Sequence, residues 1–157
     1  MPPEDRAEVS GADTHYRALE RLYASAPINR KFDSHLEIVA EGRSRLTFNV
    51  DEASYHAAGA AHGTIYFKML DDAAFYAANT LATDRFLLTT SFNLHFTKPV
   101  RVGEVVAEGR WVSGRRRVFV AEARLVDGEG EEIGRGTGTF MRSRIALSSL
   151  KGYAPRP

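Results

Sequence analysis

The sequence of 157 residues contains no cysteine. This excludes disulfide bonds, thiolate-rich zinc sites and cysteine nucleophiles, and it agrees with a reducing compartment. An excess of one charge is also absent, since 21 Lys and Arg residues stand against 20 Asp and Glu residues, for a net charge of +1. Proteins that bind nucleic acids usually carry a strong basic excess, so we expect no nucleic-acid partner.

Long apolar runs are missing as well. No run approaches the roughly 20 residues that cross a bilayer, and the first six residues lack the apolar stretch of a signal peptide. We therefore expect a cytoplasmic protein with no membrane partner. Hydrophobic residues still make up 43% of the chain, which is typical of globular proteins. At this length we expect a flexible N-terminal arm over residues 1–12, which hold two prolines and a glycine, and a single domain over residues 13–157.

Apolar residues at helical spacing predict a first helix after residue 12; they are Tyr16, Leu19, Leu22 and Tyr23. Asp13 or Thr14 can cap its N-terminus, and Pro27 ends it because the residue before a proline avoids the helical conformation. Over residues 35–50 the apolar side chains occupy even-numbered positions, which predicts a half-buried strand. Gly42 marks a bulge or turn within that strand.

Residues 62–79 are good helix formers and are apolar nearly all round, so they predict a buried helix. Four antiparallel strands follow. In residues 86–96, even-numbered apolar residues predict one inward face, with Thr89 on the other. Three alternate glycines in the last strand, residues 132–144, predict that a close-packed element, such as the central helix, lies across it; they are Gly134, Gly136 and Gly138. This order favours an α+β hot-dog fold, a long central helix wrapped by a curved antiparallel sheet of about five to six strands.

Two adjacent carboxylates interrupt the apolar helix. Asp71 and Asp72 lie about 100° apart around it and face different surroundings. Lys68 precedes Asp72 by four residues, which predicts an ion pair at a solvated edge. Asp71 shares its face with apolar residues, so we expect it to be the more buried acid. Since an ionised carboxylate is costly to bury, Asp71 is either functional or held by structural hydrogen bonds.

The start of the same helix offers a complementary group. The first amides of a helix have no internal partner and can hold an oxyanion, and Gly63 lets a substrate approach closely. However, nine residues from His62 to Asp71 span roughly 13 Å. Gly63 and Asp71 of one helix therefore cannot both touch one carbonyl. If both act in one site, they come from two copies of the chain, so we expect a homodimer or a tetramer.

The block from Gly59 to Asn79, with its His-Gly start and its aspartate nine residues after the histidine, resembles a known family. Together with the strand that ends at Pro99 and Gly103, it is similar to the phenylacetic-acid-degradation type of acyl-CoA thioesterase in the hot-dog superfamily. The likeness covers roughly residues 35–145. It implies hydrolysis of coenzyme A thioesters without a metal or other cofactor.

The resemblance also implies roles for particular residues. Asp71 matches the catalytic carboxylate, acting as nucleophile or as general base on water. Gly63 matches the amide donor to the oxyanion. Thr89 lies where family members often carry a serine or threonine that helps to place the water or the acid.

Two positions depart from the family pattern. His56 stands where many members have an asparagine that orients the thioester or water, and Thr64 replaces a second glycine beside the substrate. Because histidine donates hydrogen bonds and titrates near neutral pH, His56 predicts an acid limb of activity that vanishes in His56→Asn. Alternatively, His56 only braces its loop. His62 is a further catalytic candidate, with the same bracing role at the helix start as its alternative.

Substrate contacts are less defined. Lys98, Arg115 and Arg116 could bind the phosphates of coenzyme A, although a run of arginines is more often a solvated turn. Aromatic residues that could line an acyl pocket hint at aromatic or medium-chain acyl groups; they are Tyr66, Phe75 and Phe92.

Two other functions stay open. A hot-dog hydratase or dehydratase uses a histidine with an acid, which His56 or His62 with Asp71 could supply. A non-catalytic acyl-CoA-binding module of a regulator would normally carry a DNA-binding segment, but residues 1–34 predict only one short helix. The five histidines lack the spacing of metal ligands, so we expect no metal site.

Overall fold

The computed structural model describes residues 10–155. Residues 1–9 of the expected N-terminal arm lie outside this range. Its last two residues are helical, because α1 (Gly11–Ser25) begins at Gly11. Ser10 is the N-cap, and its side chain accepts a hydrogen bond from the Asp13 amide at 3.1 Å. The predicted caps, Asp13 and Thr14, are thus wrong by one turn of helix.

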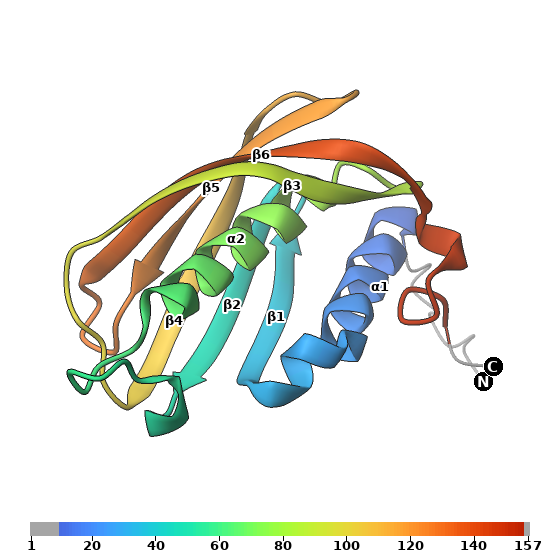
Figure 1. The fold of residues 1–157 in the computed structure, drawn as a ribbon. Coiled ribbons are helices and arrows are strands. Elements are labelled where there is room, and N and C mark those ends of the chain that lie inside the picture. Colours follow the sequence, from blue (N-terminus) through green and yellow to red (C-terminus); the bar gives the residue numbers. More distant parts are fainter. Residues whose placement is uncertain (1–9, 156–157) are drawn as a thin grey trace, which may run out of the picture.

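Within residues 10–155, six strands and a central helix make up most of the fold. The strands form one antiparallel sheet in the order β1-β2-β4-β5-β6-β3, which curves around α2 (Figure 1). The central helix is α2 (Gly63–Asn79). The strands are β1 (Asp33–Ala40), β2 (Arg43–Val50), β3 (Arg85–Phe96), β4 (Gly103–Ser113), β5 (Val118–Val126) and β6 (Glu132–Ala146). Short 3₁₀ helices are η1 (Pro27–Lys31), η2 (Glu52–Ser54) and η3 (Leu147–Ser149). The predicted α+β hot-dog fold is confirmed.

The strand expected over residues 35–50 is in fact a hairpin. Gly42 has a φ of 72° and turns the chain between β1 and β2. Leu36 then pairs with Leu46 across the hairpin, and both are buried. The even-numbered apolar pattern runs through both strands because the turn keeps even-numbered residues on the same face.

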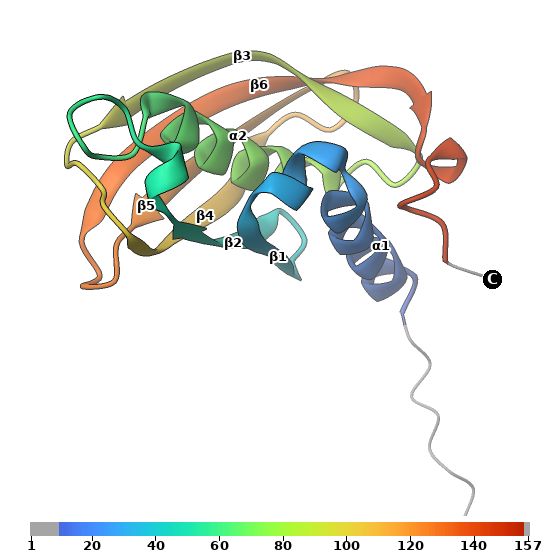
Figure 2. The same cartoon turned by 60° about the horizontal axis from the view of Figure 1, so that its bottom comes forward.

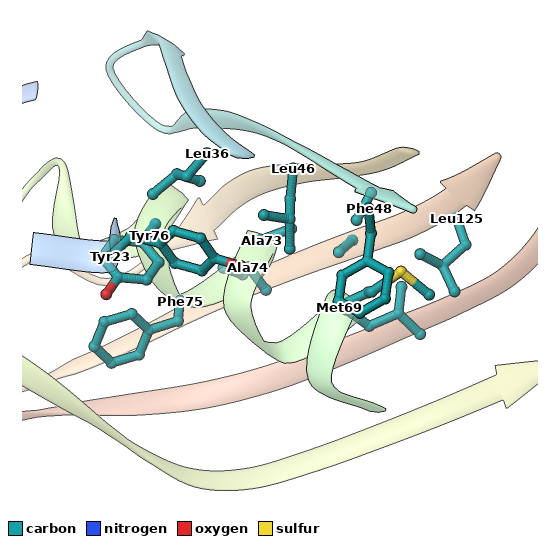
Figure 3. Close-up of a cluster of buried hydrophobic side chains, with 14 of the residues drawn as sticks. Tyr23, Leu36, Leu46, Phe48, Met69, Ala73, Ala74, Phe75, Tyr76 and Leu125 are labelled. Carbon is teal, nitrogen blue, oxygen red and sulfur yellow. The ribbon is translucent and has the colours of Figure 1, made fainter. Parts of the chain in front are cut away.

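The core lies between α2 and the concave face of the sheet (Figure 3). Helix and sheet approach closely at Gly109 in β4, where a Cβ atom would lie 2.0 Å from the carbonyl oxygen of Ala73. The glycines of β6 have a different role from the expected one. The ring of Phe92 lies over two of them, since a Cβ at Gly136 or Gly138 would lie 2.4 or 2.5 Å from it, whereas a Cβ at Gly134 would lie 3.2 Å from the carbonyl oxygen of His95. A neighbouring aromatic ring, and not the helix backbone, uses that space.

Strand β3 occupies an edge of the sheet and contains a bulge. Thr89 and Ser91 pair with consecutive residues of β6, so Thr90 is an extra residue. Leu87 and Thr89 face α2 before the bulge, and Phe92 faces it afterwards. The expectation of one unbroken even-numbered face is therefore wrong, because the bulge shifts the alternation by one residue and turns Thr89 toward the helix.

Helix α1 and the last described residues cover the end of α2 (Figure 2). The buried His15 ring bonds the hydroxyl of Tyr153 at 2.7 Å and the carbonyl oxygen of Asn79 at 2.9 Å. Tyr23 packs edge-on against Tyr76 at 5.6 Å between ring centroids. These contacts fix α1 beside the C-terminal part of α2, and η1 follows beside the middle of α2, where Asn29 accepts a hydrogen bond from Lys68. None of the helices within residues 10–155 is long and apolar enough to span a membrane.

Candidate functional site

Asp71 faces β3 from the middle of α2. Thr89 donates a hydrogen bond from Oγ1 to Asp71 Oδ1 at 2.8 Å. Burial raises the pKa of Asp71 to about 6, although the Thr89 hydrogen bond lowers it, and the neighbouring charge of Asp72 raises it further. At neutral pH the carboxylate is ionised but close to its titration range. A carboxylate in this state can accept a proton.

Asp72 has a different partner. Lys68 Nζ lies 2.5 Å from Asp72 Oδ2 and donates to Asn29 Oδ1 at 2.6 Å, which confirms the predicted ion pair. The solvated setting is wrong, since η1 and two aromatic rings cover the ammonium and leave the Lys68 side chain only 13% exposed. Burial raises the pKa of Asp72, and Lys68 opposes that rise.

The expected contrast in burial between the two carboxylates is also wrong. Asp71 and Asp72 are both half-buried. They differ instead in their partners, because Asp72 faces a cation and Asp71 faces a hydroxyl group. Asp71 therefore remains free to take up a proton without breaking an ion pair.

A hollow of about 280 Å³ adjoins the two carboxylates; we call it the first hollow. It lies between η1, α2 and the start of β3, and its apolar walls include Ile28, Phe75 and Phe86. Of the aromatic residues expected in a pocket, Phe75 lines this hollow. Tyr66 and Phe92 lie elsewhere, Tyr66 stacked on Phe96 at 4.7 Å and Phe92 edge-on to Phe67 at 5.6 Å.

The N-terminus of α2 is the second part of the candidate site. His62 is the N-cap, and its Nδ1 accepts the Thr64 amide at 3.1 Å. Gly63 is the first helical residue, and within residues 10–155 no hydrogen bond satisfies its amide. A donor is thus available at the positive end of the helix. It lies eight residues, or roughly 12 Å of helix, from Asp71 in the same chain.

His56 lies in an exposed turn before α2. Its Nδ1 accepts the Ala58 amide at 3.0 Å, and its own amide donates to the Ala60 carbonyl at 2.9 Å. The neutral ring therefore carries its proton on Nε2, which keeps one donor available. His56 braces the loop, as the alternative interpretation predicts, while its second nitrogen stays free to contact a ligand. Both predicted roles are compatible with this geometry.

Lys98 is held in an ion-pair network. Its Nζ lies 3.2 Å from Asp127 Oδ2 and 2.8 Å from Glu131 Oε2, and these carboxylates raise its pKa. A phosphate would have to compete with both of them. Asp127 and Glu131, with Glu129, form the one group of three possible metal ligands within residues 10–155, and Lys98 already neutralises part of their charge.

The predicted arginines lie at the other end of the sheet. Arg115 packs over the Trp111 ring at 4.5 Å and lies 3.6 Å from Glu41. Arg116 accepts a hydrogen bond on its carbonyl from Arg142 at 2.8 Å. The Trp111 amide donates to the Gly42 carbonyl, next to the C-terminus of α2. The Lys98 carbonyl instead accepts a hydrogen bond from Tyr66, near the N-terminus of α2. One chain therefore does not bring Lys98 and the arginines together.

Sequence reasoning missed a basic cleft of about 770 Å³ between α1, η1 and the C-terminal residues. Its cationic lining consists of Arg21, Arg30 and Lys151. Residue 151 is separated from the other two by about 120 positions, so no local motif could have revealed the cluster. Docking of the C-terminal residues on α1 creates it.

Comparison with known proteins identifies the family. A sequence model of the thioesterase superfamily matches residues 58–133. A candidate esterase of Saccharolobus solfataricus is 30% identical over 115 residues, covering 73% of this chain and 77% of the relative. Transcription factor FapR of Shouchella clausii is 32% identical over 123 residues, which cover 75% of this chain but only 61% of the factor.

Similarity in structure agrees with these relationships. The PaaI protein of Escherichia coli, from the phenylacetic acid degradation operon, has a TM-score of 0.79 at 16% identity. The match covers 87% of this chain and 99% of PaaI. The family model, the sequence relative and the shared fold agree. This chain therefore belongs to the thioesterase superfamily of hot-dog proteins.

Proposed function

We propose that the protein hydrolyses acyl-CoA thioesters to the free acid and coenzyme A. The observation that carries the proposal is the Asp71 carboxylate, held by Thr89 at 2.8 Å beside the apolar first hollow. Burial raises its pKa to about 6. A general base is most effective when its pKa lies near the working pH, so this carboxylate suits the activation of water.

The proposed reaction begins with a water molecule beside Asp71. As the water oxygen bonds to the thioester carbon, the carboxylate takes one of its protons. The tetrahedral oxyanion accepts a hydrogen bond from a Gly63 amide. The oxyanion then re-forms its carbonyl as the carbon–sulfur bond breaks, and the departing sulfur takes the proton that Asp71 had accepted. The acid and coenzyme A are released, and the carboxylate is regenerated. No cofactor enters this scheme, and Thr89 holds the carboxylate in place.

We propose that the Gly63 amide comes from a second copy of the chain. Roughly 12 Å of helix separates Gly63 from Asp71, so one copy supplies only half of the site. Strand β3 leaves one edge of the sheet unpaired, and the adjacent Phe67 and Phe96 are 41% and 52% exposed. Edge-to-edge pairing of two β3 strands would cover these groups and set the two helices antiparallel.

A second interface would make a tetramer. Leu88, Met141 and Val118 pair in register across three neighbouring strands, and all three are exposed. Such an apolar stripe on an outer sheet face is typical of a protein contact. Sedimentation at micromolar concentration tests both steps, and particles of 17 kDa alone would contradict the shared site.

Mixing of two inactive variants gives a sharper test of sharing. Asp71→Asn and Gly63→Pro each damage a different half of the site. In a mixed dimer, one of the two sites then combines the intact Asp71 with the intact Gly63. Random re-pairing of equal amounts should restore about a quarter of the wild-type sites. If the site lies within one chain, mixing restores nothing.

The direct test of function is thioester cleavage. A panel of acyl-CoAs is incubated with the protein and a thiol reporter, and enoyl-CoA hydration is measured in parallel. Release of thiol supports hydrolysis. Hydration alone would favour a hydratase, although one chain keeps His56 and His62 at the start of α2, away from Asp71.

FapR is a transcription factor, so the similarity to it favours one alternative, a regulatory domain without catalysis, for which we propose acyl-CoA as the ligand. Such a domain needs a ligand pocket but no general base. It would bind acyl-CoA tightly, release no thiol, and tolerate Asp71→Asn without loss of affinity. An acyl-CoA binding titration on the wild type and this variant separates the two functions.

A further inference from the structure

A second hollow lies directly behind the first. It has a volume of about 340 Å³ and lies between α1, α2 and the end of β6, with apolar walls that include Leu22, Pro27, Ile145 and Leu150. The first hollow opens next to Asp71, whereas the second contains neither carboxylate. The two spaces share three lining residues, which form the partition between them: Ala26, Tyr76 and Phe86.

Of the three residues in the partition, Phe86 is the one whose truncation would connect the first hollow with the second. Ala26 has only a methyl group. Tyr76 is 6% exposed and is fixed edge-on against Tyr23 and Phe75, at 5.6 and 5.0 Å between centroids. Phe86 is half-buried, and its ring centroid lies 5.1 Å from that of Phe75. Its side chain therefore provides the bulk that closes the far side of the first hollow.

We infer that the first hollow receives the acyl group and that Phe86 sets the maximum length of that group. The inference rests on the proposed thioesterase function. An acyl carbon held for attack beside Asp71 would direct its substituent into the adjoining apolar space, away from water. A dry cavity of about 150 Å³ holds a benzene molecule, so 280 Å³ accommodates an acyl group of about six to ten carbons.

Phe86 acts on specificity and not on the chemical step. It lies on the side of the first hollow that adjoins the second, which contains neither carboxylate, and its side chain has no group that could take part in proton transfer. Truncation to alanine would join the first hollow to the second. Longer acyl chains would then bury additional methylenes, while short chains would lose only their contact with the ring.

The test compares kcat/KM for hexanoyl-, decanoyl- and tetradecanoyl-CoA in the wild type, Phe86→Ala and Phe86→Leu. We expect Phe86→Ala to raise the ratio of tetradecanoyl- to hexanoyl-CoA turnover by at least about tenfold, because each accommodated methylene favours the longer substrate. Phe86→Leu should shift the ratio in the same direction by less, and it keeps the test decisive if the alanine variant does not fold. Phe92→Ala is the matched control, since Phe92 lies on the same strand but lines neither hollow.

Two results would overturn the inference. One is an unchanged chain-length profile in folded Phe86 variants. The other is an equal loss for every chain length, which would mean that Phe86 contacts the pantetheine arm. Uncleavable S-alkyl thioethers of coenzyme A, with hexyl and tetradecyl chains, provide a separate binding measurement by calorimetry. If the wild type hydrolyses nothing, the proposed function fails, but a shift of thioether preference in Phe86→Ala still supports the pocket assignment and its absence refutes it.

Discussion

Replacement of Asp71 by asparagine should make the protein more stable and nearly inactive. The pKa of Asp71 is about 6, against 3.8 for an unperturbed aspartate, chiefly because of burial. At about 1.36 kcal/mol per pKa unit, the ionised carboxylate destabilises the fold by about 3 kcal/mol at most. Part of the group faces solvent, which screens this effect, so we expect asparagine to recover about 1–2 kcal/mol at pH 8.

The pH dependence gives the direction of this effect. Because the folded-state pKa is raised, the folded protein holds this proton more tightly than the unfolded chain does. The stability contributed by Asp71 is complete below pH 3.8 and is lost as the pH rises through about 6. Asp71→Asn does not titrate, so its advantage should be present at pH 8 and absent at pH 4.

Thermal denaturation and thioester turnover measure the two consequences together. For a chain of this size, about 1 kcal/mol corresponds to roughly 2–4 °C in Tm, so Tm should rise by about 2–8 °C at pH 8. Turnover should fall by about 10²–10⁴-fold, as expected for loss of a general base. A variant that is less stable at pH 8, or that keeps its activity, would refute the reasoning and make Asp71 a structural carboxylate.

Asp72→Asn is the matched control for the same helix. It removes the partner of Lys68, whose side chain is only 13% exposed, and leaves a covered ammonium without its carboxylate. We expect this variant to lose about 1–3 kcal/mol at pH 8 and to keep most of its turnover. The two neighbouring variants should therefore change stability in opposite directions, and only Asp71→Asn should lose most of its turnover.

Four further predictions follow from single contacts. Thr89→Val removes the hydrogen bond that lowers the pKa of Asp71, so the acid limb of kcat/KM should move to higher pH and turnover should fall about tenfold. His56→Asn should keep substantial activity, because asparagine can accept a hydrogen bond from the turn amide and donate one to a ligand, whereas His56→Ala should lose more activity. The acid limb of activity should persist in His56→Asn because the pKa of Asp71 is about 6, contrary to the expectation from sequence. Burial lowers the pKa of His15, so denaturant titrations should show stability falling below about pH 6.5, and this loss should shrink in His15→Gln. Gly109→Ala should destabilise the fold by about 3 kcal/mol or more in the same titrations, since its Cβ would lie 2.0 Å from a carbonyl oxygen of α2.

Patterns of local periodicity predicted the fold well. The central helix was found because residues 62–79 are apolar nearly all round, and the structure begins α2 at Gly63. The glycines of β6 show where such reasoning fails. Their spacing indicates that something bulky lies above them, but it does not distinguish the helix from Phe92, which is 40 or more residues away in sequence.

The candidate site was predicted in part. Helix geometry and family resemblance together led to Asp71 and Thr89, and the structure brings these two side chains into contact. The surroundings of Lys68 could not be predicted, because residues of η1 that cover it lie about 40 positions earlier. The same applies to Lys98, whose carboxylate partners belong to a hairpin about 30 positions later. Local patterns identify charges, but tertiary contacts decide whether those charges are free.

The bulge in β3 has a consequence for comparing this chain with its relatives. Thr89 pairs with Phe140 and Ser91 with Thr139, so removal of Thr90 would leave every other pair in register and keep Thr89 facing α2. Loss or gain of one residue elsewhere in the strand would instead turn half of its side chains to the opposite face. An alignment of related sequences therefore has one natural place for a single-residue gap within this strand. Evolution can shorten the strand at Thr90 without moving Thr89 away from Asp71, and related chains one residue shorter should differ there.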